Sequence, residues 1–191
     1  MKKIVLSLIV VFLFFAFTNN SRAQDMKVGA QIGVALPLGD FGDVASTGFG
    51  GLGTFHYVLK PNITLTGALG YYYFGSDKDI SNALGSYGDY SYSIIPLVAG
   101  IRYHLGKKAD EFNPYIGGEI GLYFVSFSYK ANLPYWGTQE YSDSENKFGL
   151  SPMAGFTYNL QKNLVLDVNA KFSVVEDLNH FVVNVGLIFN L

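Results

Sequence analysis

The sequence contains no cysteine, so its stability cannot come from disulfide bonds. Charged residues make up only 15% of the chain, which is low for the surface of a soluble domain. After residue 17 no apolar run approaches the roughly 20 residues that a membrane-spanning helix needs. In hydrocarbon only helices and closed barrels satisfy every backbone polar group. If the mature protein resides in a membrane, it must therefore cross with strands.

The N-terminal segment has the composition of a secretion signal. Lys2 and Lys3 precede an apolar run over residues 4–17, and small residues then occupy the two positions that a signal peptidase reads, ending at Ala23. The apolar run is shorter than a comfortable membrane span, which also favours a cleaved signal. No cysteine lies near the cleavage site, so a lipid-anchored precursor is not expected.

We therefore predict a signal peptide over residues 1–23 and a β-barrel domain over residues 24–191. Cleavage leaves 191 − 23 = 168 residues. It also removes three of the 13 basic residues, so 10 remain against 15 acidic residues and the mature net charge is −5. An acidic chain of this kind is not expected to bind nucleic acid.

Apolar and polar residues alternate with a period of two, most clearly from Leu164 to Leu191, and this pattern predicts strands rather than helices. The prediction is an all-β fold: an eight-stranded antiparallel up-and-down transmembrane β-barrel. The expected strands are Met26–Leu36, Gly48–Leu59, Asn62–Phe74, Tyr90–Leu105, Pro114–Tyr129, Lys147–Leu160, Asn163–Val175 and Asn179–Leu191.

The connections between these strands alternate in length, as short periplasmic turns and long external loops do in outer-membrane barrels. The long segments Pro37–Thr47, Gly75–Asp89 and Lys130–Asn146 are expected to be mobile extracellular loops. Aromatic residues near the strand ends are expected to form two girdles at the membrane boundaries. At the loop ends these are Tyr71, Tyr72, Tyr73, Phe74, Tyr90, Tyr92, Phe124, Phe127 and Tyr129, and at the turn ends Tyr57, Tyr103, Tyr115 and Tyr158.

Several segments carry a family resemblance. Residues 93–105 contain an apolar-Pro-Leu strand, residues 114–121 read Pro-Tyr-Ile-Gly-Gly-Glu-Ile-Gly, and residues 148–156 with 163–167 fit the strands that follow. On these motifs the chain resembles the small bacterial outer-membrane β-barrel domain proteins, which include PorT-type barrels and share the architecture of the OmpA transmembrane domain and OmpX. The resemblance covers essentially the whole mature chain.

The resemblance implies a monomer in the bacterial outer membrane, in contact with outer-membrane lipids and lipopolysaccharide. Members of the family often end in an aromatic residue that the barrel-assembly machinery reads during biogenesis. Here the chain ends Phe189-Asn190-Leu191, with leucine where phenylalanine is commoner. The resemblance supports fold and location better than any activity.

If the apolar strand faces point outward, a set of polar side chains enters the lumen, where buried charges must pair. We predict an ion pair between Arg102 and Glu119, shared with Asp167. The interior of an eight-stranded barrel is just wide enough to be filled by side chains, so this network is expected to rigidify the barrel, with a gate or binding site as the alternative. The network comprises Arg102, Glu119, Asp167, Lys171, Lys27 and His56, and Gln31, Asn169 and Asn184 are also expected in the lumen.

No residue constellation identifies a reaction. The histidines, His56, His104 and His180, lack the spacing of a nucleophile–base–acid set, and the acidic loops lack the spacing of a calcium loop. We therefore predict no catalytic residue, metal site or cofactor. In the third long loop, Tyr135 and Trp136 are a candidate interaction tip, and anchoring of that loop at the lipid headgroups is the alternative.

The leading hypothesis is a non-enzymatic structural or surface-interaction protein that presents extracellular loops, with a protein partner as one candidate ligand. The main alternative is a narrow porin-like channel for ions or small solutes. Two others remain: a lipid-modifying outer-membrane enzyme, and a soluble barrel of the lipocalin type with its apolar face inward, because alternation alone does not orient a barrel.

Overall fold

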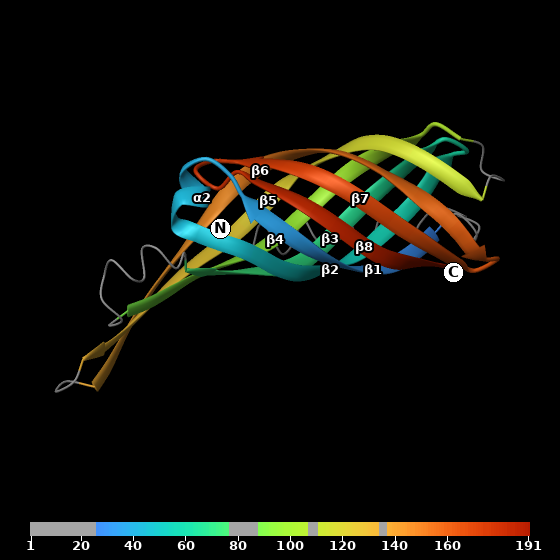
Figure 1. The fold of residues 1–191 in the computed structure, drawn as a ribbon. Helices are drawn as coiled ribbons and strands as arrows, with labels where there is room; N and C mark the ends of the chain where they lie inside the picture. The colour runs from blue at the N-terminus through green and yellow to red at the C-terminus, as the bar shows by residue number, and fades with distance from the viewer. Residues whose placement is uncertain (1–25, 77–87, 107–110, 134–136) are drawn as a thin grey trace, which may run out of the picture.

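The computed structural model describes residues 26–76, 88–106, 111–133 and 137–191. These residues form one closed barrel in which each strand pairs with its neighbours in the chain and β1 pairs with β8 (Figure 1). Every neighbouring pair is antiparallel. The predicted fold is therefore confirmed, whereas the predicted signal peptide lies outside the described residues.

All eight predicted strands are present, and most are longer than the sequence pattern indicated. One short helix, α2 (Asp40–Val44), lies between the first two strands. No helix of the described residues is long and apolar enough to cross a membrane. The strands are β1 (Met26–Pro37), β2 (Ala45–Lys60), β3 (Ile63–Ser76), β4 (Gly88–His104), β5 (Phe112–Leu133), β6 (Gly137–Gln161), β7 (Leu164–Val175) and β8 (His180–Asn190).

The barrel has two different ends. The basal end carries the short β2–β3 and β6–β7 turns, and there β1 begins beside the last residues of β8, with Lys27 opposite Asn190. The opposite end, which we call the loop end, carries α2 (Figure 1). In outer-membrane barrels the short turns face the periplasm.

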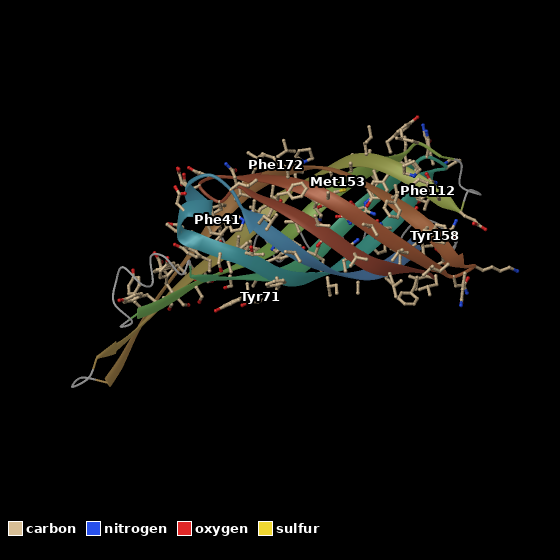
Figure 2. All side chains as sticks on the ribbon, viewed as in Figure 1. Phe41, Tyr71, Phe112, Met153, Tyr158 and Phe172 are labelled. Atoms are coloured by element: carbon tan, nitrogen blue, oxygen red, sulfur yellow. The ribbon has the colours of Figure 1, made fainter. Side chains whose placement is uncertain are left out.

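The outer surface of the barrel is apolar, and the polar and charged residues that the sequence assigned to the lumen are inside. Large apolar side chains point outward and remain exposed, among them Ile32, Phe49, Leu69, Ile116, Phe148 and Phe189. Phe172 and Tyr71 lie on this outer surface in Figure 2. An exposed belt of this kind suits a hydrocarbon environment and would be unfavourable in water. The lipocalin-type orientation is thereby excluded.

The predicted loop over residues 130–146 is wrong for most of its length. β5 and β6 continue as a paired hairpin as far as Leu133 and Gly137. On the β6 side, residues 137–146 contain one large apolar residue, Tyr141, so this stretch lacks the one-sided alternation on which the strand prediction depended. Backbone hydrogen bonds between two strands do not require such a face. Residues 77–87 of the second predicted loop lie outside the described part of the chain.

The predicted aromatic girdles are correct for only part of the residues assigned to them. Tyr71 and Tyr73 point outward and are 48% and 49% exposed, but Tyr72 and Phe74 are buried in the lumen. Consecutive residues of a strand lie on opposite faces, so a run of four aromatic residues has to divide between lipid and lumen. Tyr90 and Tyr115 are also buried inside the barrel.

Candidate functional site

The centre of the polar lumen is the carboxylate of Asp167 on β7, which is fully buried. The Nη1 atom of Arg102 donates to its Oδ2 at 2.8 Å, and the Nε2 atom of Gln31 donates to the same oxygen at 2.6 Å. The hydroxyl of Tyr115 donates to Oδ1 at 2.7 Å. These three donors come from β4, β1 and β5, so one carboxylate joins strands from several sides of the barrel.

The guanidinium of Arg102 lies over the ring of Tyr115, with 4.5 Å between its Cζ atom and the ring centroid. A planar cation on an aromatic face gains a favourable electrostatic contact, and in a water-poor interior that gain increases. Arg102 is only 2% exposed. Its charge is therefore held by one carboxylate and one aromatic ring.

The predicted contact between Arg102 and Glu119 is wrong, whereas the predicted contact between Arg102 and Asp167 is present. Arg102 pairs with Asp167, while Glu119 accepts from the Nζ atom of Lys171 at 2.7 Å. Both pairs are buried and both cross the lumen between strands that are not neighbours. The sequence gives the face and approximate height of a side chain, and these two quantities do not determine which strand faces it across the barrel.

The remaining predicted members of the network lie apart from the Asp167 cluster. His56 is buried, and its Nε2 atom lies 3.0 Å from Oγ1 of Thr54. Lys27 is half-buried and lines a cavity at the basal end together with His56. Both side chains thus point inward, as the alternation indicated, but neither hydrogen-bonds the central carboxylate.

Tyrosine and serine hydroxyls were missed by the sequence analysis and contribute much of the lumen network. The hydroxyl of Tyr72 donates to Asn184 at 2.5 Å, and Asn184 donates in turn to Asn169 at 3.1 Å. A second chain joins Tyr123 to Ser151 at 2.7 Å and Ser151 to Ser173 at 3.0 Å. The alternation of each strand could have placed these hydroxyls in the lumen. Tyr72 was instead predicted to belong to a girdle, and no role was predicted for Tyr123, Ser151 or Ser173.

Glycines opposite the large lumen side chains make room for them. A Cβ atom added to Gly155 would lie 2.8 Å from the hydroxyl oxygen of Tyr115, and one added to Gly149 would lie 2.6 Å from the ring of Tyr123. Contacts this short are not tolerated without movement of the ring or the wall. Gly67, which points toward the outside, has no such neighbour within 4 Å.

The loop half of the lumen is apolar rather than polar. Phe41 of α2 is only 2% exposed and packs edge-on against Phe74 and Tyr92, with ring centroids 5.1 and 5.5 Å apart. Leu178, in the connection between β7 and β8, is buried in the same apolar cluster. The short helix therefore inserts an aromatic side chain into the mouth of the barrel and fills it.

Three strands continue beyond the barrel wall at the loop end. Pairing of β3 with β4 stops at Gly75 and Ser91, and pairing of β6 with β7 stops at Gly149 and Val175. By contrast, β5 and β6 stay paired over the whole of residues 137–148, and β4 accompanies β5 as far as Gly88. We call the part of β4, β5 and β6 beyond the wall the projecting sheet. Figure 1 shows its β5–β6 hairpin extending away from the barrel.

The two residues of the predicted interaction tip, Tyr135 and Trp136, lie outside the described residues. Within the part of the chain that the structure describes, no group of three or more histidine, aspartate or glutamate side chains is placed to hold a metal ion.

A model of the outer membrane protein β-barrel domain family matches residues 6–189. The comparison with curated proteins gives no match. Among solved structures, the attachment invasion locus protein Ail of Yersinia pestis is similar, with a TM-score of 0.56 and 15% identity over 86% of this chain and 98% of Ail.

Neisserial surface protein A superposes with a TM-score of 0.55 and 17% identity, over 87% of this chain and 97% of that protein. OprG of Pseudomonas aeruginosa superposes with a TM-score of 0.52 and 12% identity, over 88% of this chain and 93% of OprG. At these identities the likeness shows the fold alone.

Proposed function

The chain is a member of the outer membrane protein β-barrel domain family, and from that premise we propose that it is a non-enzymatic surface-interaction protein of the bacterial outer membrane. The barrel anchors the protein in lipid, and the projecting sheet is the part that meets a partner outside the cell. The observation that carries this proposal is the open edge of β6: over residues 137–148, no strand of the described residues pairs with β6 on its β7 side.

An open strand edge presents unpaired backbone N–H and C=O groups, which can bind an extended segment of another protein. The side chains of residues 141–146 are exposed, and Tyr141 is 63% exposed. Asp143 and Glu145 add negative charge to this stretch. Two copies of the same acidic edge would repel each other, so the edge favours a foreign partner over self-association.

The contents of the lumen argue against the channel alternative. Phe41 fills the loop half, and the buried ion pairs of Asp167 and Glu119 fill the middle. Recordings in planar bilayers test this directly. Reproducible conductance steps from the purified protein would favour a channel, and their absence is the expected result.

The histidine contacts support a role without catalysis. The Nδ1 atom of His180 lies 2.7 Å from the carbonyl oxygen of Leu178, and the ring of His56 contacts Thr54. A histidine that acts as a general base needs a nucleophile at one ring nitrogen and an orienting group at the other. Unchanged lipid A and phospholipid profiles in a deletion strain are the expected result.

Biogenesis follows from the family. We propose export by a cleaved signal peptide over residues 1–23, insertion by the barrel-assembly machinery, and a monomer whose apolar belt contacts outer-membrane lipid and lipopolysaccharide. N-terminal sequencing of the protein from outer membranes should begin at Gln24. Recovery of the protein in the soluble fraction would contradict the membrane assignment.

Site-specific photo-crosslinking in intact cells tests the surface role. A photoreactive residue at Tyr141 on the exposed edge should give a saturable adduct of one defined mass, identifiable by mass spectrometry. The matched control is Leu160, which is 47% exposed at the basal end of the same strand. Equal crosslinking at both positions, or none at Tyr141, would refute the proposal.

A further inference from the structure

A cavity of about 70 Å³ lies inside the basal end of the barrel. Its volume holds a few water molecules or one ion of phosphate size. Residues on all eight strands contribute to its wall, and among the described residues that line it none is an aspartate or glutamate. Its polar lining consists of Lys27, His56, Thr64, Arg102, His104, Asn113, Thr157 and Asn159. We call this space the basal cavity.

The lining of the basal cavity is rich in hydrogen-bond donors and positive charge. Lys27 and Arg102 are cationic at neutral pH, and each neutral imidazole of His56 and His104 carries one N–H donor. The Oγ1 atom of Thr64 lies 3.4 Å from the Nε2 atom of His104, at the wall of the cavity. Asp167 compensates the charge of Arg102 from the side of the lumen network. The chemistry of the cavity is therefore that of an anion site.

Arg102 supplies a second, independent indication. Its Nη1 atom donates to Asp167, but its Nε atom is buried and has no hydrogen-bond partner among the residues that the structure describes. Buried donors are almost always satisfied by protein, water or a ligand. A guanidinium edge with a vacant N–H next to a carboxylate-free cavity is a typical arrangement for binding an oxyanion.

We propose that the basal cavity binds one small oxyanion from the periplasmic side, either free inorganic phosphate or the phosphate or carboxylate group of a larger molecule. Arg102 donates through Nε, Lys27 contributes charge at the entrance, and His56 and His104 donate from the walls. The site lies at the opposite end of the barrel from the projecting sheet, so it is independent of the proposed surface function.

The test is an NMR titration of the full mature barrel, folded in detergent micelles, with sodium phosphate at constant ionic strength and pH. The imidazole signals of His56 and His104 should shift and saturate. The signal of His180, which is buried near the loop end between Phe74 and Tyr123, is the internal control and should stay constant. Acetate and a short-chain phosphatidylglycerol form two further arms. If phosphate or acetate saturates the shifts of His56 and His104, the ligand of the cavity is a free anion. If only the lipid does so, the ligand is a lipid headgroup.

Two variants locate the site. Arg102→Lys keeps a cation for Asp167 but removes the Nε donor, and Lys27→Gln removes a half-buried charge that is not required for the Asp167 cluster. Each should weaken the affinity by about tenfold or more, the loss expected for one charge-assisted hydrogen bond. Lys147→Gln, which removes a cation near the loop end, should leave the affinity unchanged.

If Arg102→Lys fails to fold, Lys27→Gln decides the question alone. The proposal is overturned if no ligand gives a saturable shift, if His180 shifts as much as His56, or if Lys27→Gln and Lys147→Gln have the same effect.

Discussion

The two halves of the lumen are held together by different forces. In the basal half, hydrogen bonds and ion pairs to buried carboxylates hold the interior together, as Asp167 and its three donors show. In the loop half, Phe41, Phe74 and Tyr92 are packed by shape. In a polar interior, removal of one partner lowers the free energy of unfolding sharply, because a charge or donor is left unsatisfied. In an apolar interior, the loss of stability increases with the volume removed.

The location of the protein explains why so polar an interior is acceptable. In a soluble domain the apolar side chains must gather inside, but here the lipid receives them on the outer wall. The lumen is thereby free to hold Arg102, Asp167, Lys171 and Glu119, provided that each charge has a partner.

The largest effect is expected in the basal half, from Asp167→Ala. The substitution leaves the guanidinium of Arg102 buried without its carboxylate, which should lower the free energy of unfolding by about 3–5 kcal/mol. Urea unfolding of the protein in lipid vesicles measures this. The double variant with Arg102→Met should recover much of the loss, because it removes the orphaned charge. A single-variant loss below about 1 kcal/mol would contradict the distinction between the halves.

A smaller effect is expected in the loop half, from Phe41→Ala. Truncation of this ring should cost about 2–3 kcal/mol, less than in a rigid core, because the short helix that carries it can move into the space. Phe41→Leu should retain most of the stability, since volume rather than polarity is what this half requires. The same unfolding assay applies. If Phe41→Leu lowered the free energy of unfolding as much as Phe41→Ala, side-chain volume would not be what stabilises this region.

The smallest effect is expected from a substitution in the barrel wall, at Gly155. Gly155→Ala should cost about 1–3 kcal/mol, because the new methyl group would overlap the backbone carbonyl of Val168 and the ring of Tyr115. The matched control is Gly67→Ala, where the new methyl group has no neighbour within 4 Å. Its effect should stay within about 0.5 kcal/mol. The difference between the two midpoints of urea unfolding is the measurement, and equal midpoints would refute the steric role of Gly155.

Much of the barrel could be predicted from the sequence because alternation is a local property. Leu164 to Val175 shows its apolar and polar faces directly, and the same reasoning placed Asp167 and Lys171 in the lumen. The partners of these residues could not be predicted in the same way. Which side chain faces Asp167 across the barrel depends on the tilt and stagger of all eight strands, and no local pattern contains that information.

Two other differences have local causes. Residues 130–146 were predicted as a loop because residues 137–146 are almost entirely polar, although the described residues of β5 and β6 pair as far as Leu133 and Gly137. Tyr72 and Tyr115 were predicted at the lipid boundary because tyrosine is common there. Their positions in the strand alternation place both side chains in the lumen, where they are buried. The short helix that carries Phe41 was not predicted at all, since five residues are too few for a helical pattern.

The Asp167 cluster also bears on how the chain reaches its final shape. Gln31 and Asp167 are 136 residues apart in the chain, and their bond spans from the first strand to the seventh. The aspartate cannot acquire all its donors while the wall is still an open curved sheet. The hydrogen bond from Gln31 forms only when β1 has paired with β8 and the barrel is closed. The cluster therefore stabilises the closed barrel relative to an open sheet.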